Sequence, residues 1–158
     1  MTHPSAEIRS ARPSDQEAMD ALVDEDAQAS IFQRPIWGRA VERQFGHSRA
    51  DLVAWDGDRL VGVLPLSLVR SLGGGRALIS VPYGVYGGAL GKSSAVREAL
   101  LSEAVARSRA KNYRRLELRC RVALEPVAAE SFTISDLYCG FSRTLPQQVE
   151  QVLGSIPK

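Results

Sequence analysis

Apolar and polar residues follow two different periods along the chain. Helical spacing bounded by capping residues predicts helices over 15–24, 35–45 and 94–110. Alternation with a period of two, or a short apolar run between turn residues, predicts strands over 7–11, 51–55, 59–70, 76–81, 113–122 and 136–145. A last helix is expected over 146–156. The order β-α-α-β-β-β-α-β-(α)-β-α favours an α/β fold with a mixed central sheet flanked by helices.

The centre of this sheet is predicted from one hairpin. Asp56-Gly57-Asp58 separates two apolar runs, and Asp-Gly in that position is a strong turn signal. The second arm, Arg59–Arg70, is apolar on both faces for much of its length, which indicates a central strand covered on two sides. Pro65 lacks the N–H that a sheet ladder needs, so we expect a bulge there.

The stretch Ser80–Ser94 joins a strand to a long helix and is rich in glycine and tyrosine. Glycine tolerates positive φ and lets a ligand approach the backbone, and the helix N-terminus that follows favours an anion. The end of a strand where a helix begins is also a common place for a binding crevice. The alternative is a connection whose tyrosines only pack. The candidate ligand contacts are Tyr83, Gly84, Tyr86, Gly87 and Gly88.

The composition is that of an ordinary globular protein. With 158 residues, 44% of them hydrophobic, and a formal net charge of +2, the chain fits one domain and does not suggest a nucleic-acid binder. No apolar run is long enough to span a membrane, and no hydrophobic signal sequence is recognisable. Two scattered cysteines and two histidines predict no metal site. We expect a cytoplasmic protein.

Common catalytic motifs are missing from the sequence. Gly91-Lys92-Ser93 is similar to the end of a P-loop, but that motif needs glycine where Tyr86 stands. The dinucleotide-binding pattern GxGxxG is absent, and no Ser–His–Asp or Cys–His set is visible around His47. The arginines of 107–121 leave RNA binding open as an alternative to a solvated surface. The catalytic residues are therefore unknown from the sequence.

Three segments together resemble proteins of the FemAB type. They are Ile31–Gly46 (IFQRPIWGRAVERQFG), Leu60–Leu66 (LVGVLPL) and Ser80–Gly88 (SVPYGVYGG). The resemblance covers about residues 7–156 and is greatest to the FemAB-related group associated with the PEP-CTERM system. That group belongs to the GNAT superfamily of acetyltransferase-like proteins. The resemblance thus implies a GNAT-like fold with its core over about 7–145.

The resemblance also implies a function. FemAB-type proteins transfer an acyl or aminoacyl group to an amine, so we expect a transferase that acts on a cell-envelope or exopolysaccharide-related precursor. The implied donor is acyl-CoA or aminoacyl-tRNA. Arg39 is the nearest match to a basic residue that contacts substrate phosphate in such proteins. The alternative is a non-catalytic ligand-binding or interaction module with a GNAT-like fold.

The sequence departs from these relatives in two places. The GNAT pyrophosphate loop, a basic residue or Gln followed by x-x-Gly-x-Gly/Ala, is replaced by Tyr83–Gly88, which weakens the case for acetyl-CoA. Relatives carry two GNAT-like domains in tandem, so 146–158 is expected to begin a helix toward a second domain. Apolar residues on that helix would otherwise favour self-association. The single domain 1–158 is then expected to have little turnover alone.

Overall fold

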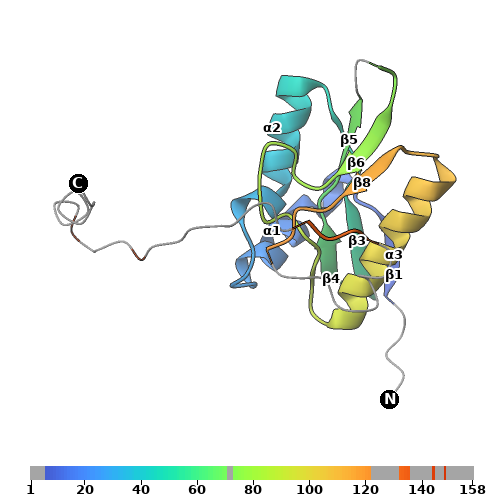
Figure 1. Ribbon diagram of the computed structural model, residues 1–158. Helices are drawn as coiled ribbons and strands as arrows, with labels where there is room; N and C mark the ends of the chain where they lie inside the picture. Colours follow the sequence, from blue (N-terminus) through green and yellow to red (C-terminus); the bar gives the residue numbers. More distant parts are fainter. Residues whose placement is uncertain (1–5, 71–72, 122–131, 136–143, 145–147, 149–158) are drawn as a thin grey trace.

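The computed structural model describes residues 6–70, 73–121, 132–135, 144 and 148 (Figure 1). In this part of the chain, one sheet has the strand order β1-β3-β4-β7 and the other the order β2-β5-β6-β8. The strands are β1 Glu7–Ser10, β2 Ser48–Arg49, β3 Leu52–Asp56, β4 Arg59–Leu64, β5 Ser67–Arg70, β6 Arg76–Ile79, β7 Leu90–Gly91 and β8 Arg115–Glu117. The helical elements are η1 Pro13–Asp15, α1 Gln16–Asp24, η2 Ile31–Gln33, α2 Pro35–Phe45 and α3 Ser94–Ala110.

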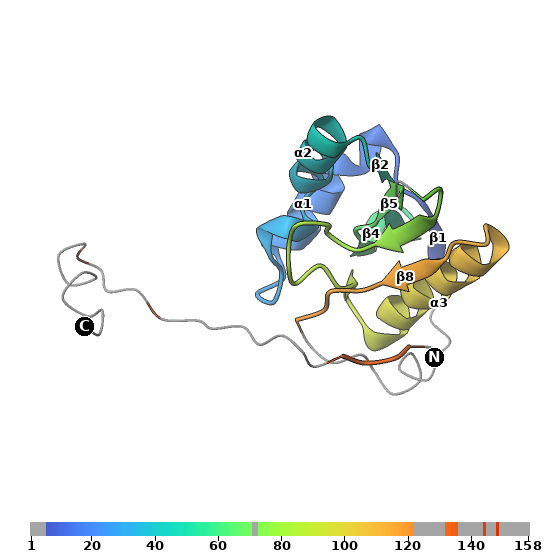
Figure 2. The ribbon, with the colours of Figure 1, turned by 45° about the horizontal axis from the view of Figure 1, so that its top comes forward.

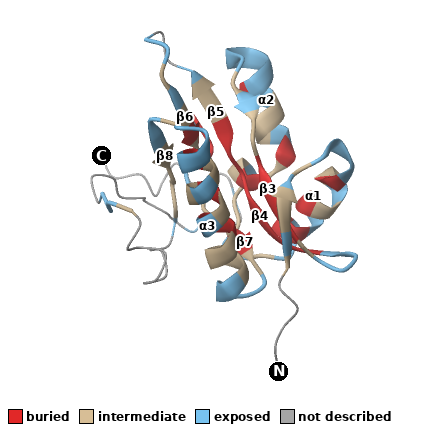
Figure 3. Ribbon diagram, turned by 90° about the vertical axis from the view of Figure 1, so that its right-hand side faces the viewer, coloured by how far each residue is buried: buried red, intermediate tan, exposed pale blue. Residues whose placement is uncertain are grey.

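The hairpin β3–β4 forms the centre of the first sheet, as predicted. Gly57 takes the left-handed conformation of the turn, with φ of 56°. Both strands are buried on two faces, and Figure 3 shows them as the red centre of the molecule between α1 and α3. On the α3 side the core contains Leu52, Ala54, Val61, Leu64, Leu66, Leu100, Leu101 and Ala104. On the α1 side it contains Met19, Leu22, Val23, Val53, Leu60, Val63 and Leu90.

The predicted second arm of the hairpin is two strands rather than one. The chain leaves the first sheet after Leu64 and enters the second sheet at Ser67, so Pro65 marks a change of sheet and not a bulge. The register shift lies instead between Ala54 and Trp55. The N–H of Leu66 donates to a carboxylate oxygen of Asp51 at 2.9 Å, which replaces the ladder bond lost at the break.

The boundaries predicted for the helices over 15–24, 35–45 and 94–110 are confirmed to within one residue, but α2 is only partly buried. Pro35 begins α2, and Gly46 ends it with φ of 69°. The hydroxyl of Ser93 accepts a hydrogen bond from the Val96 amide at 3.3 Å and caps α3. In α2 the apolar residues Ile36 and Phe45 are 53% and 49% exposed.

The predicted strand over 113–122 is much shorter in the structure. Asn112 leaves α3 with φ of 50°, and only Arg115–Glu117 forms β8, parallel to β6. The predicted strand 136–145 and helix 146–156 lie outside the described residues, apart from the single residues 144 and 148. Within the described ranges, no helix is long and apolar enough to cross a membrane.

Candidate functional site

The carboxyl ends of the parallel strands β6 and β8 meet the glycine- and tyrosine-rich segment. We define residues 81–88 as the 81–88 loop. In Figure 2 the green to yellow chain after β6 passes between the blue helical segments and the orange chain that follows β8. Crevices at the carboxyl ends of parallel strands are common binding sites. The structure thus places all five predicted contacts from Tyr83 to Gly88 in one loop at such an edge.

The chain after β8 is hydrogen-bonded to this loop rather than separated from it. The Ser80 amide donates to the Glu117 carbonyl at 2.9 Å, and the Gly87 amide donates to the Arg119 carbonyl at 2.7 Å. The Arg119 guanidinium donates to the Gly84 carbonyl at 3.1 Å. The loop therefore fills the space beside the extended end of β8 with its own backbone.

Side chains from η2 and α2 hold the other side of the loop. Trp37 donates its indole N–H to the Pro82 carbonyl at 3.2 Å, and Gln33 donates from Nε2 to the Gly88 carbonyl at 2.7 Å. Gln33 is buried, and its Oε1 accepts the Ser30 amide at 2.8 Å. The Ser30 hydroxyl donates to the Tyr86 carbonyl at 3.1 Å. Trp37 is thus half-buried and directly supports the loop.

Three residues of the loop, none of them glycine, have left-handed backbone. Val81 has φ of 44°, Tyr83 of 61° and Tyr86 of 58°. The sequence suggested that the loop glycines would take this conformation. In the described chain, however, the glycines with positive φ are Gly46, Gly57 and Gly74, and all three lie outside the loop. Left-handed conformations cost L-residues about 1 to 2 kcal/mol each, and β-branched valine is especially unsuited to them. Such strain persists where surrounding contacts enforce it, and it concentrates at functional sites.

The loop glycines are needed for close packing inside the protein. A Cβ on Gly84 would lie 2.7 Å from the Phe32 ring, and one on Gly87 would overlap the methyl groups of Val81. A Cβ on Gly88 would lie 3.0 Å from the sulfur of Cys120. Burial raises the pKa of the Cys120 thiol, which does not favour a reactive thiolate at this position.

Aromatic side chains make the outer surface of the loop. The Tyr83 ring stacks on Phe45 with 4.1 Å between centroids, and its hydroxyl lies 3.2 Å from Nε2 of His47. The His47 and Tyr83 rings are nearly parallel, at 7°. Tyr83 is 58% exposed. Tyr86 is half-buried, with the Arg121 guanidinium 5.4 Å from its ring centroid.

Arg39, the remaining predicted contact, takes a different direction from Trp37. Its guanidinium is hydrogen-bonded to the side-chain oxygen of Gln16 in α1. The structure therefore brings the five loop residues together but turns Arg39 toward the first helix. Its contact with a substrate phosphate stays a prediction.

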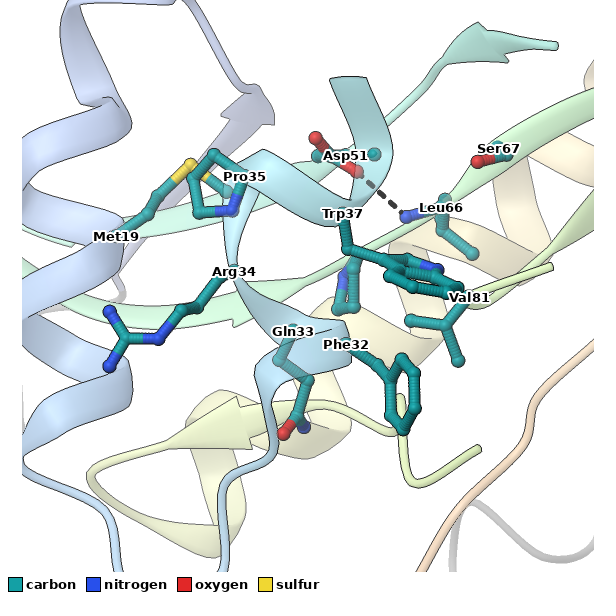
Figure 4. A pocket seen from close by; sticks show the side chains of 12 residues that line it. Met19, Phe32, Gln33, Arg34, Pro35, Trp37, Asp51, Leu66, Ser67 and Val81 are labelled. Carbon is teal, nitrogen blue, oxygen red and sulfur yellow. Dashed lines mark hydrogen bonds between the residues drawn. The ribbon is translucent and has the colours of Figure 1, made fainter. Parts of the chain in front are cut away.

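A small pocket lies behind the loop, on the other side of Trp37 (Figure 4). Its cavity volume is about 10 Å³, roughly the room that one water molecule needs, so it does not enclose a drug-sized ligand. The lining residues are Met19, Phe32, Gln33, Arg34, Pro35, Trp37, Gly38, Asp51, Pro65, Leu66, Ser67 and Val81.

Asp51 is a buried ionisable group among these lining residues. Its carboxylate accepts hydrogen bonds from Arg49 Nε at 2.9 Å and Nη2 at 2.5 Å, in addition to the Leu66 amide. Burial raises the pKa of Asp51, and the charge of Arg49 opposes that rise. All of these partners are structural, so Asp51 holds the strand break in place.

Comparisons by sequence find no relative. No protein-family profile matches the chain, and no curated protein matches it. Comparisons by structure do find proteins of similar fold. A ribosomal-protein-alanine N-acetyltransferase from Brucella melitensis biovar Abortus 2308 matches with a TM-score of 0.59 at 15% identity, over 90% of this chain and 100% of that chain.

Two further solved structures agree with this match. A GNAT family acetyltransferase from Staphylococcus aureus has a TM-score of 0.53 at 12% identity, over 90% of this chain and 100% of that chain. An acetyltransferase from Trypanosoma brucei has a TM-score of 0.54 at 16% identity, over 91% and 99%. The chain has the GNAT fold. At these identities the likeness establishes the fold alone, and it confirms the predicted α/β architecture.

Sequence reasoning missed two residues at the edge of the loop of this GNAT fold. Neither Phe45 nor His47 was among the ligand contacts predicted from the sequence. One signal was present in the sequence: Gly46, between them, ends the helix and lets both rings project from its end. Both side chains contact Tyr83, which lies 36 residues after His47 in the chain. A contact over that distance could not be predicted from the sequence.

Proposed function

We propose that this chain is the amino-terminal GNAT-like domain of a FemAB-like acyl or aminoacyl transferase. Its substrate would be an amine of a cell-envelope or exopolysaccharide-related precursor. The observation that carries the proposal is the 81–88 loop, which is strained, anchored by four side chains and located at the carboxyl ends of β6 and β8 in a GNAT fold. A second GNAT-like domain, or a second copy of this chain, would complete the enzyme.

The reaction is the attack of a substrate amine on an activated acyl carbonyl. A carbon–nitrogen bond forms, the bond from the carbonyl carbon to the donor oxygen or sulfur breaks, and the amine gives up a proton. Holding the two reactants in position can supply much of the rate of such a step. In this proposal the loop and Arg39 bind and orient the precursor, and no residue of the described chain is assigned as the general base.

The residues at the start of α3 do not fit the pyrophosphate of an acyl-CoA well. The Gly87 amide already donates to Arg119, the Ser93 hydroxyl caps the helix, and the Lys92 amide donates to the Val61 carbonyl at 2.9 Å. The Lys92 ammonium is paired with Glu25. An open cradle of free amides, as a glycine-rich anion loop provides, is not formed by these groups. We therefore place aminoacyl-tRNA ahead of acyl-CoA as the donor.

The same hydrogen bonds favour a second candidate, a non-catalytic binding module. The backbone amides of Gly84 and Gly87 donate within the chain, to the carbonyl groups of Val81 and Arg119. They are therefore not free to stabilise an oxyanion, which is a large part of acyl-transfer catalysis. In this case the loop surface would hold a ligand while another domain or protein performs the chemistry.

The two candidates are separated by a transfer assay. The donors would be acetyl-CoA and aminoacyl-tRNA, the acceptor a nucleotide-linked amino-sugar peptide, and the readout the acylated acceptor by mass spectrometry. We expect little turnover by the 158-residue chain alone, and turnover with aminoacyl-tRNA when a second GNAT-like domain is joined to it. Robust turnover of the chain alone with acetyl-CoA would replace the proposal by a stand-alone acetyltransferase. No turnover in either form would favour the binding module.

A further inference from the structure

Exposed apolar side chains are concentrated around the 81–88 loop. Among the described residues, six large apolar side chains are strongly exposed, and five of them belong to η2, α2 or this loop: Ile31, Ile36, Phe45, Tyr83 and Val85. These elements contact one another through Phe32 and Gly84, Trp37 and Pro82, and Phe45 and Tyr83. Exposed apolar groups gathered in this way mark a binding surface.

One part of this surface consists of two nearly parallel aromatic rings, with a third ring stacked on one of them. We define the aromatic platform as Tyr83 and His47, with Phe45 stacked on Tyr83. The hydrogen bond between the Tyr83 hydroxyl and His47 Nε2 joins the two ring edges. The left-handed backbone at Tyr83, φ of 61°, belongs to the strained loop that presents this ring at the surface.

We propose that the aromatic platform binds an uncharged glycan chain by stacking against one sugar ring. The apolar C–H groups on one face of a pyranose ring pack well on an aromatic face, while its hydroxyl groups project from the edges. At the platform, the Tyr83 hydroxyl and the imidazole of His47 lie at the ring edges, where they can bond such hydroxyls. Glycan binding at the platform does not depend on the proposed transfer reaction.

The openness of the platform favours a chain molecule over a small free ligand. Sites for small ligands enclose most of the ligand surface. Tyr83 is 58% exposed and Phe45 49% exposed, and neither ring lines the pocket behind Trp37. An extended polymer can cross such a surface and gain affinity from several weak contacts along its length.

The surrounding charges and backbone groups favour a glycan over single-stranded RNA. Proteins that bind RNA by stacking combine aromatic rings with cations that neutralise phosphates. Arg119, which reaches the carbonyl next to Tyr83, is already paired with Glu117 at 2.8 Å. The backbone groups that could read a base edge, at Gly84 and Gly87, bond within the chain.

The test is a binding titration followed by calorimetry and ligand-observed NMR. The probes are two uncharged tetrasaccharides, cellotetraose and chitotetraose, and a tetrauridylate of similar length. We expect at least one tetrasaccharide to bind the wild-type chain, and Tyr83→Ala to weaken that binding about three- to tenfold, the range expected for one aromatic contact. Tyr83→Phe keeps the ring and should lose less affinity than Tyr83→Ala.

Tyr113→Ala is the matched control, since Tyr113 precedes β8 and its ring is 5.6 Å from the Arg76 guanidinium, away from the carboxyl ends of the strands. It should leave tetrasaccharide affinity unchanged. Circular dichroism of each variant checks that the fold is kept, and Phe45→Leu serves as a second platform variant should Tyr83→Ala not fold. The proposal is overturned if neither tetrasaccharide binds, if Tyr113→Ala weakens binding as much as Tyr83→Ala, or if only tetrauridylate binds through Tyr83.

Discussion

The β3–β4 hairpin and the 81–88 loop are stabilised in different ways. The hairpin is held by an antiparallel ladder with one register shift, and it is covered on both faces by aliphatic side chains from α1 and α3. The loop has no ladder of its own. It is held by single hydrogen bonds from Trp37, Gln33, Ser30 and Arg119 to its carbonyl groups, and it contains three strained residues.

The difference indicates that the two regions contribute differently to stability. Buried aliphatic residues in a regular sheet contribute stability directly, by roughly 1.5 to 3 kcal/mol for each large side chain. The left-handed backbone of Val81, Tyr83 and Tyr86 lowers stability, and at Tyr83 this strained backbone carries an exposed ring. We infer that the hairpin stabilises the fold, and that the loop presents a surface at the expense of stability.

The largest effect is expected where the loop is packed most closely. In Gly87→Ala the new methyl group would overlap the side chain of Val81, so we expect a loss of about 3 kcal/mol in the free energy of unfolding, measured with urea. Adding Val81→Gly removes the obstructing side chain and relieves the backbone at φ of 44°. The double variant should therefore be more stable than Gly87→Ala alone.

Gly57→Ala is the control for this experiment, because no atom lies within 4 Å of its added methyl group. That variant should show only the cost of a left-handed alanine, about 1 kcal/mol. Two results would contradict the prediction: the free energy of unfolding falls no more in Gly87→Ala than in Gly57→Ala, or Val81→Gly fails to restore it. Either result would show that the close contact between residues 81 and 87 does not determine the stability of the loop.

A smaller and pH-dependent effect is expected in the regular half of the molecule. Arg9 donates two hydrogen bonds to Asp15, at 2.7 and 2.8 Å, and these hold the pKa of the Asp15 carboxyl below its usual value of 3.8. A lowered pKa stabilises the fold above the unfolded value, and this contribution is lost as the pH falls through the folded value. Asp15→Asn should lose about 1 to 2 kcal/mol at pH 7.

Urea unfolding of wild type and Asp15→Asn between pH 7 and pH 2 checks this prediction. The two curves should be parallel above about pH 5 and approach each other below 3.8, where the wild-type carboxylate becomes protonated. A constant difference down to pH 2 would show that Asp15 acts through shape or capping and not through its charge pair with Arg9.

Local signals in the sequence predicted the regular half of the fold well. The Asp-Gly turn, Pro35 at the start of α2, Gly46 at its end and Ser93 before α3 all specify a boundary through their own backbone preferences. The buried β4 strand follows from its continuous apolar run. The change of sheet at Pro65 was not predictable in the same way, because it depends on the carboxylate of Asp51, 15 residues earlier.

The candidate site was predicted only as a segment of sequence. The glycines and tyrosines of 80–94 indicated where a loop would lie, but glycine has two uses, positive φ and close packing, and the sequence does not distinguish them. In the structure, Gly84 and Gly87 serve close packing, while Val81 and Tyr83 take the positive φ values. Long-range contacts decide that assignment.

The most direct test of the central claim is the stability of Tyr83→Asn, measured together with its tetrasaccharide binding. Asparagine tolerates left-handed backbone better than tyrosine, as Asn112 does here with φ of 50°. We predict that the free energy of unfolding changes by less than about 1 kcal/mol, because relief of strain offsets the lost stacking on Phe45. Tetrasaccharide binding should weaken about three- to tenfold in the same variant, as for Tyr83→Ala. A loss of stability of about 3 kcal/mol or more, with binding unchanged, would show that Tyr83 serves the fold and not a ligand.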